Sequence, residues 1–357
     1  MNTRGINPMV NCGDNSIISD RNSFLHEISN SINNGISTLP LNPGFELHPY
    51  KNILKNFNVN KYIIGTFPPI SYLIDIIRQE NIEISLLKQP TFPNQLINQP
   101  QIPFFHGNVT GLWSVLLTQI EIEELSIIRN LNRFEAKLFL INWLVKNQIY
   151  YDDIIELTQR KLGRLKPNNN LGYTYEDVNL VHICPDLSLV AKVLNNDNLK
   201  VICFTNGKTF ASGKSGGLNI SKDGKVNTKD SDALSIFLRT CQNLGMKIEM
   251  QCQPYFSWIN IQDLSNIQKR TKLIFEIRIT KTNLCTNKLF DKFNQKIVTV
   301  MTPYSPAAHG KIENHPIVLS FKNQYGLNYT AIKILPIIYE KFKNNTYLDL
   351  YNFNINE

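Results

Sequence analysis

Three short loops of this chain carry side chains whose types could do chemistry together. They are Gly-Thr-Phe-Pro-Pro at 65–69, Thr-Asn-Gly-Lys at 205–208 and Thr-Pro-Tyr-Ser-Pro-Ala-Ala-His-Gly at 302–310. Each follows a short apolar run that is typical of a buried strand. Proline and glycine ending a strand would explain any one loop alone. Because the carboxyl ends of parallel strands meet at one edge of a sheet, we expect the three loops together to form one site.

The loops need a scaffold of alternating strands and helices to position them. The strands before them are expected at 61–64, 201–204 and 297–300, and further strands at 154–157, 248–252 and 273–279. Helices are expected at 72–77, 111–117, 134–145, 187–193, 233–244 and 330–343. Strand, tight loop and helix in succession predict an α/β protein with a three-layer αβα fold around a central, mostly parallel sheet.

The composition divides the chain into parts of different character. Residues 1–45 carry scattered Asn, Ser, Gly and Pro and are interpreted as an extension, and residues 346–357 as a tail. The main domain is expected at 46–345, with an α+β insertion at about 211–295. A length of 357 residues with 42% hydrophobic side chains is ample for a large core.

The net charge indicates the class of partner, and the cysteines indicate the compartment and whether a metal is bound. A formal charge of +8 favours a polyanion, most often nucleic acid, although the Lys-, Asn- and Ile-rich usage of an AT-rich genome also raises the charge. The six cysteines form no C-x-x-C pair, so we expect no metal and reduced, mostly buried thiols in the cytoplasm. No apolar run approaches the roughly 20 residues that span a bilayer. The expectation is a cytoplasmic monomer without membrane contact.

Several segments together resemble the uracil-DNA glycosylase superfamily. They are HPYKNILKNFNVNKYIIGTFPP, FFHGNVTGLW, YDDIIELTQRK, CPDLSLVAKVLNNDNLKVICFTNGKTF and TPYSPAAHG. The segments resemble bacterial members whose first motif is GTFPP or GSFPG, a group that includes enzymes acting on hypoxanthine. The likeness covers about residues 47–210 and 296–312 and skips the insertion. Such motifs in the same order, each after a strand, are moderately specific together and weak singly.

The resemblance implies a monofunctional DNA glycosylase, which flips one base out of DNA and hydrolyses its N-glycosidic bond, leaving an abasic site. It implies DNA as partner and no cofactor. Flipping costs a few kcal/mol of unstacking, which contacts in the base pocket must offset. The expected base-binding residues are Gly65, Thr66, Phe67, Pro68 and Asn206. Phe67 suits stacking on a base or packing in the core equally, and Asn206 suits a base edge or a turn.

The residue that holds the attacking water is open. The best-known uracil enzymes use an Asp at the position of Phe67, whereas the GSFPG-type relatives use an Asn before a Phe-Trp pair. That Asn position is Thr110 here, and Asn108 lies two residues earlier, so Asn108 is the first candidate, ahead of His106 and Thr110. A turn and helix start would explain these residues equally well.

Two neighbouring carboxylates are the alternative for activating water. Asp153 and its neighbour Asp152 are the nearest carboxylates in the matching segment, and either suits a general base, although a capping or surface role is commoner for Asp.

The last loop is expected to contact DNA. Its members are Tyr304, Ser305, Pro306 and Ala307, joined by Lys311 and by Lys208 of the second loop. Relatives carry a His at the position of Pro303, so His309, or else Tyr304, is the substitute that we expect to stabilise the departing base. A solvent-facing histidine and solvated lysines are the simpler explanations.

The excised base and the activity class also stay open at this level. A deaminated base such as uracil or hypoxanthine and a bulky modified cytosine of phage DNA, removed in antiviral defence, are equal candidates. The alternatives are a catalytically inactive DNA-binding module on the same fold and a nucleoside or nucleotide N-glycosidase. A purely structural protein would leave the three loops unexplained.

Overall fold

The computed structural model describes thirteen segments of the chain. They are residues 45–48, 50–51, 54, 57–68, 102–105, 111–161, 163–164, 171–172, 179–205, 232–252, 257–260, 274–303 and 316–347. The chain divides into two compact units. The first consists of residues 1–53, 67–107 and 155–186, and the second of residues 54–66, 108–154 and 187–357.

The first unit contains a three-stranded antiparallel sheet in the order β1-β4-β7. Its strands are β1 (Phe45–Leu47), β4 (Ile155–Arg160) and β7 (Leu180–Pro185). A separate two-stranded ribbon pairs β5 (Gly163–Arg164) with β6 (Leu171–Gly172). The first unit also contains a buried cluster of five rings, which begins directly after β1. The rings are those of His48, Tyr50, Phe67, Phe104 and Phe105.

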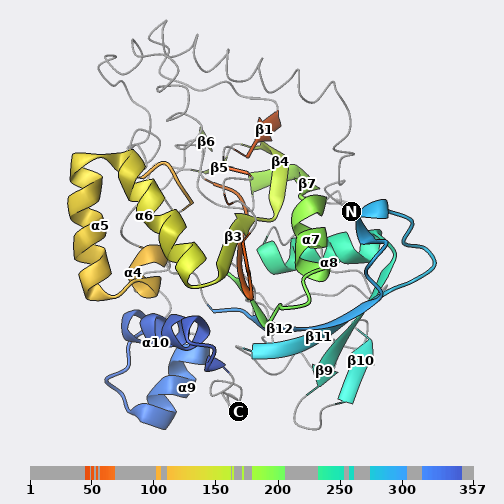
Figure 1. The fold of residues 1–357 in the computed structure, drawn as a ribbon. Coiled ribbons are helices and arrows are strands. Elements are labelled where there is room, and N and C mark those ends of the chain that lie inside the picture. The colour runs from red at the N-terminus through yellow and green to blue at the C-terminus, as the bar shows by residue number, and fades with distance from the viewer. Residues whose placement is uncertain are drawn as a thin grey trace, which may run out of the picture. The chain divides into compact units, whose positions relative to one another are not determined.

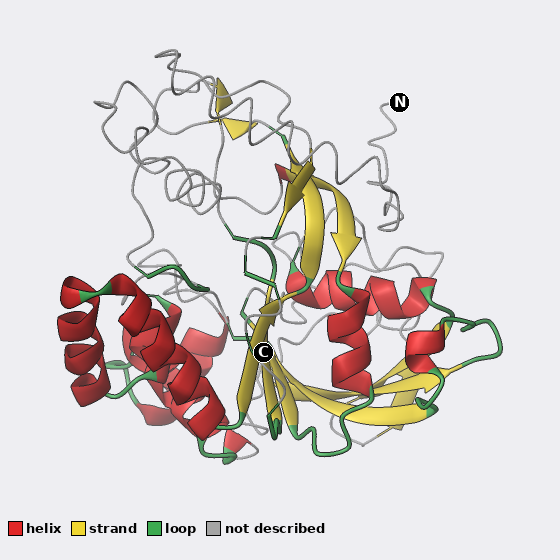
Figure 2. Cartoon of the chain, turned by 45° about the horizontal axis from the view of Figure 1, so that its top comes forward, coloured by secondary structure: helices red, strands yellow, loops and turns green. Residues whose placement is uncertain are grey.

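The second unit is built on a seven-stranded sheet in the order β10-β9-β11-β12-β8-β2-β3 (Figures 1 and 2). Its strands are β2 (Lys61–Gly65), β3 (Ile149–Asp153), β8 (Val201–Phe204), β9 (Met246–Cys252), β10 (Ser257–Asn260), β11 (Ile274–Lys281) and β12 (Gln295–Met301). Three parallel pairings join β3, β2, β8 and β12, and three antiparallel pairings add β11, β9 and β10. Five of the seven strands therefore point the same way, and the sheet is mostly parallel.

Helices cover both faces of this sheet. They are α4 (Leu112–Leu116), α5 (Gln119–Leu131), α6 (Arg133–Lys146), α7 (Leu187–Leu194), α8 (Ala233–Asn243), α9 (Pro316–Tyr325) and α10 (Ala331–Lys343), with a 3-10 turn, η4 (Lys288–Phe290). Cys203 and Phe204 are consecutive residues of β8. The hydroxyl of Tyr339 on α10 contacts the thiol of Cys203, whereas the centre of the Phe204 ring lies 5.7 Å from that of Phe237 on α8. Because consecutive strand residues point to opposite faces, α8 and α10 lie on opposite sides, and the second unit has αβα layering.

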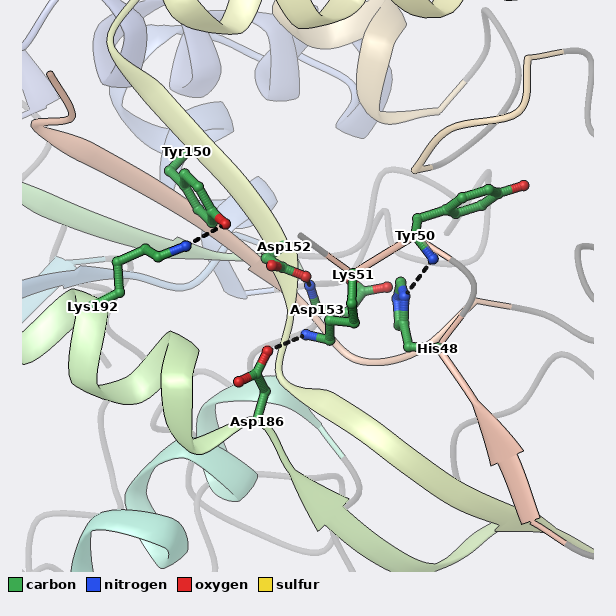
Figure 3. A network of polar contacts seen from close by, with 8 residues as sticks. All are labelled: His48, Tyr50, Lys51, Tyr150, Asp152, Asp153, Asp186 and Lys192. Atoms are coloured by element: carbon green, nitrogen blue, oxygen red, sulfur yellow. Dashed lines mark hydrogen bonds and ion pairs between the residues drawn. The ribbon is translucent and has the colours of Figure 1, made fainter. Parts of the chain in front are cut away.

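Helix α7 is fastened to the parallel strands by polar contacts. Nζ of Lys192 donates to the hydroxyl of Tyr150 at 2.6 Å and lies 4.2 Å from the centre of that ring (Figure 3). Tyr62 donates its hydroxyl to the carbonyl of Lys192 at 3.3 Å. Tyr62 and Tyr150 are both almost wholly buried, so these contacts fix α7 over β2 and β3.

Most predicted elements are present. The strands β2, β8, β9, β11 and β12 and the helices α4, α6, α7, α8 and α10 fall at or within a few residues of the expected ranges. The predicted helix at 72–77 lies outside the described residues. The prediction of one strand at 154–157 is wrong in its extent: the chain forms β3 up to Asp153 and then β4, in two different sheets.

The expectation of wholly reduced cysteines is also wrong. Cys184 on β7 is disulfide-bonded, and its partner lies outside the described side chains. Cys203, Cys241 and Cys285 are free and buried. Burial raises the pKa of the Cys203 thiol to about 12, so this thiol is inert at neutral pH. None of the helices among the described residues is both long and apolar enough to cross a membrane.

Candidate functional site

The parallel strands reverse their order between β2 and β8. Along the chain β2 comes first, β3 then pairs on one side of it, and β8 pairs on the other side, followed by β12. In open α/β sheets, the crevice at the carboxyl ends of strands at such a reversal is the usual place for a ligand. The carboxyl ends of β2 and β8 are therefore the first place to look for a site in the second unit.

The register of the strands brings four sequence-distant residues to that one edge. Gly65 pairs with Asp153, and Ile64 pairs with Phe204, so Thr205 follows directly beside Gly65. The amide of Thr205 donates to the carbonyl of Ile64 at 3.0 Å, which continues the pairing past the end of β8. On the far side of β8, Met301 pairs with Cys203, and this pairing places Thr302 at the same edge.

Gly65 is a position where a side chain has no room. A Cβ atom there would overlap Oδ1 of Asp153 and would lie 3.4 Å from Oγ1 of Thr205. The carboxylate of Asp153 therefore lies over the backbone at the end of β2, and the hydroxyl of Thr205 is close by. The glycine of the first loop is required for this close approach rather than for a left-handed backbone.

The two consecutive aspartates have different surroundings. Asp152 and Asp153 are 3% and 5% exposed. Oδ1 of Asp152 accepts a hydrogen bond from the amide of Asp153 at 2.8 Å, so the Asp152 carboxylate is turned onto its own backbone (Figure 3). The Asp153 carboxylate is the one beside Gly65. Of the two carboxylates that the sequence offered, Asp153 is the one at the switch-point edge.

Hydroxyl groups complete the described part of this edge. Thr66, Thr205 and Thr302 are all buried, at 8%, 4% and 0% exposure. A threonine hydroxyl both donates and accepts, and an ionised aspartate only accepts. A carboxylate with a hydroxyl nearby, as Asp153 has in Thr205, can orient a water molecule and take its proton, or can bind the polar edge of a planar ring. Thr205 and Thr302, the first residues of their loops, were not among the site residues predicted from the sequence, which instead included Asn206 and Ser305.

The remainder of the first loop belongs to the first unit and is held there by a buried arginine. Nη2 of Arg160 on β4 donates to the carbonyl of Pro68 at 3.0 Å, and the guanidinium carbon lies 5.9 Å from the centre of the Phe67 ring. The ring of His48 meets Phe67 edge-on at 5.3 Å. Phe67 is only 7% exposed. These contacts account for Phe67 by packing, and the stacking role stays a prediction.

His48 and Lys51 are further buried polar residues of the first unit. Nδ1 of His48 accepts a hydrogen bond from the amide of Tyr50 at 3.0 Å, so the neutral ring carries its proton on Nε2 (Figure 3). Nζ of Lys51 lies 3.0 Å from Oδ2 of Asp186, and both side chains are nearly buried. His48, Lys51 and Arg160 were not predicted from the sequence, because a polar residue buried in one strand or turn leaves no periodic signal.

Many predicted site residues lie outside the described residues. They are His106, Asn108, Thr110, Asn206, Lys208, Tyr304, Ser305, Pro306, Ala307, His309 and Lys311. Their roles stay predictions. Within the described segments, no group of three His, Cys, Asp or Glu side chains could hold a metal ion.

Comparison of the chain with protein-family models, with curated proteins and with solved structures found no match.

Proposed function

We propose that this chain is a monofunctional DNA glycosylase, which holds one extruded nucleotide at the carboxyl edge of the parallel strands and hydrolyses its N-glycosidic bond. One observation carries the proposal: β2, β8 and β12, the strands that precede the three chemically promising loops, are parallel neighbours in one sheet. Their loops therefore start from one edge. The resemblance of the ordered motifs to the uracil-DNA glycosylase superfamily adds the reaction class.

The described edge supplies a group for the water. Asp153 is next to Gly65, and in this proposal its carboxylate accepts a hydrogen bond from the attacking water. The C1′–N bond breaks with its electron pair on the base, the water oxygen bonds to C1′, and the water proton passes to Asp153. The departing base takes up a proton from a donor or from solvent. Preorganised polar groups around the base lower this barrier.

The residues beyond the described segments take the remaining roles. Asn108, with His106 and Thr110, is the alternative for orienting water, and His309 stabilises the base as it leaves. Asn206 reads the edge of the base, and the 304–307 segment with Lys208 and Lys311 holds the DNA backbone. The positive formal charge of +8 suits a polyanionic substrate. A DNA substrate favours a cytoplasmic location, whereas the disulfide of Cys184 is unusual for that compartment.

The test is base release from defined DNA. The full chain is incubated with duplexes that contain uracil, hypoxanthine or a bulky modified cytosine, and separately with the matching free nucleosides. Alkali then converts each abasic site into a strand break. Asp153→Asn is the test variant, and Asp197→Asn, at an exposed position before β8, is the matched control.

Each outcome separates the proposal from its alternatives. Release from at least one duplex, reduced by about a hundredfold or more in Asp153→Asn and unchanged in Asp197→Asn, supports the proposal. Tight DNA binding without release from any duplex indicates an inactive DNA-binding module. Release from free nucleosides alone indicates a nucleoside N-glycosidase.

A further inference from the structure

The hairpin of α5 and α6 presents apolar side chains to solvent in the second unit. Six of them are between 42% and 83% exposed: Ile120, Ile127, Leu131, Phe134, Leu138 and Val145. Single exposed apolar residues are normal on soluble proteins, but patches on the order of several hundred Å² mark interaction sites. The six residues, here called the hairpin strip, need an explanation only if they are contiguous.

The spacing makes the strip contiguous near the turn, where its members are four residues apart on each helix. Farther from the turn, seven residues separate Ile120 from Ile127 and Leu138 from Val145, and the exposed Glu124 lies in the first of these gaps. On α5 the exposed residues recur at intervals of seven and four, and on α6 at intervals of four and seven, so each set lies along one face of its helix. The helices are joined by the single residue Asn132 (Figure 1). Residues whose separations from Asn132 differ by one position are therefore nearly level with one another: Ile120 with Val145, Ile127 with Leu138, and Leu131 with Phe134.

A hydrogen bond confirms this alignment. The indole Nε1 of Trp143 donates to Oε1 of Glu121 at 3.0 Å, and these two residues lie almost equally far from the turn. The hairpin is also rigidly built. Thr118 begins α5 with a capping box that includes Glu121, and the side chain of Asn132 caps α6. The opposite side of the hairpin is buried through Leu125 and Leu140, so the strip is a preformed surface.

The two helices carry opposite net charges. Helix α5 has three glutamates and one arginine, a net charge of −2, whereas α6 has three basic residues and one glutamate, a net charge of +2. A face with one acidic helix and one basic helix is complementary to itself when a two-fold axis runs parallel to the helices. That rotation lays α5 of one copy along α6 of the other.

We propose that the hairpin strip is a self-association surface, on which a second copy of this chain packs to form a four-helix bundle. In this bundle Ile127 faces Leu138 of the partner subunit, and the acidic and basic helices are paired. From the sequence a monomer was expected. Helical periodicity alone does not show whether an apolar face of a helix packs inside the protein or is exposed to solvent. Stable interfaces bury roughly 800 Å² per partner, so the proposed bundle has to bury surface along both helices of the hairpin.

The test is the oligomeric state of the full chain. Sedimentation velocity across a wide range of concentration is expected to show a dimer for the wild type. Ile127→Glu and Leu138→Lys each place a charge twice in the interface and are expected to weaken the dimer by on the order of a hundredfold. Leu327→Glu changes a side chain that is 84% exposed away from the hairpin, and it serves as the control that leaves the dimer intact.

Mixing the two charged variants tests the pairing itself. Ile127→Glu mixed with Leu138→Lys is expected to restore a heterodimer, since the new charges of opposite sign face one another. Circular dichroism checks that each variant is folded, as expected for exposed positions. A wild type that stays monomeric at every concentration overturns the proposal. A dimer that both single variants leave intact overturns it as well, because the contact is then elsewhere.

Discussion

The carboxylate of Asp153 fills the space that a side chain at residue 65 would need. The two residues are register partners on β3 and β2, and a Cβ atom on Gly65 would overlap Oδ1 of Asp153. The glycine of the first loop and the buried aspartate of the neighbouring strand thus form one structural unit. It lies beside the strand reversal, where a ligand of an open α/β sheet is expected.

Replacing Gly65 tests this relationship through stability. Gly65→Ala is expected to lower the free energy of unfolding by about 1–3 kcal/mol, because the methyl group forces Asp153 aside. In an Asp153→Ala background the same substitution is expected to cost well under that amount, since the obstructing carboxylate is gone. Urea denaturation of the four proteins measures the coupling. Equal costs in both backgrounds would show that Asp153 does not obstruct residue 65.

Lys61 is expected to make the stability of the protein depend on pH. Its side chain is 3% exposed, and its Nζ donates to the carbonyl of Lys343 at 2.8 Å. Burial, with the charge of Lys200 as a second cause, lowers the pKa of Lys61 to about 8. An unfolded lysine has a pKa of about 10.4, so between these values the unfolded chain binds more protons and stability rises with pH.

Lys61→Met removes this dependence. At pH 7 the variant is expected to be more stable by about 1–2 kcal/mol, because the cost of holding a buried charge exceeds the value of one hydrogen bond. The advantage shrinks as the pH rises from about 8 towards 10.4, where the native lysine has become neutral. Thermal unfolding at a series of pH values measures it, with the exposed Lys333→Met as control. Parallel pH profiles for wild type and Lys61→Met would contradict the assignment.

Glu121 is expected to stabilise the α5–α6 hairpin only while ionised. Burial raises its pKa, but hydrogen bonds from the backbone and hydroxyl of Thr118 and from Trp143 outweigh burial and lower the pKa below the ordinary range. Glu121→Ala is expected to cost about 1 kcal/mol at neutral pH. The stabilisation by Glu121 is complete above the ordinary pKa of glutamate and is lost as the pH falls through the lowered pKa of the folded protein. The loss of stability caused by Glu121→Ala is therefore expected to disappear in acid. Acid titration of stability checks this, with Glu123→Ala on the same helix as control.

Arg160 is expected to hold the Phe67–Pro68 part of the first loop. Arg160→Lys keeps the charge but loses the planar fork, which donates to the carbonyl of Pro68 and lies against Phe67. A loss of about 1–3 kcal/mol in unfolding free energy is expected, because a buried carbonyl loses its donor. Arg129→Lys, at a more exposed position on α5, is expected to change little. Equal stability of the two variants would remove the positioning role of Arg160.

The strands that define the site were predictable because they are buried on both faces. In β2 and β8 every residue is buried, and the sequence shows this directly as short apolar runs. Strand β3 is buried just as fully but contains Asp152 and Asp153, and these charges hid it from pattern reasoning. Helix α5 was not predicted because apolar residues such as Ile127 lie on its exposed face. They weaken the alternation of apolar and polar faces by which a surface helix is identified.

The candidate site was predictable only in part. Asp153 entered through its place in a matching segment, and the structure adds its close approach to Gly65, which no spacing in the sequence reveals. Arg160 contributes through a single tertiary contact with a loop more than ninety residues away. Such contacts depend on how strands pair across the chain, and pairing is not encoded in local periodicity.

The central claim is that an extruded base lies at the carboxyl edge of β2, β3, β8 and β12. Photocrosslinking tests it most directly: a duplex with a single iodouracil is bound to the full chain, irradiated, and the attached peptide is sequenced. The account predicts attachment within 65–66, 153–154, 205–208 or 302–307, and loss of that attachment with excess uracil-containing duplex. Attachment at the opposite edge, where β2 and β8 begin at Lys61 and Val201, would contradict it.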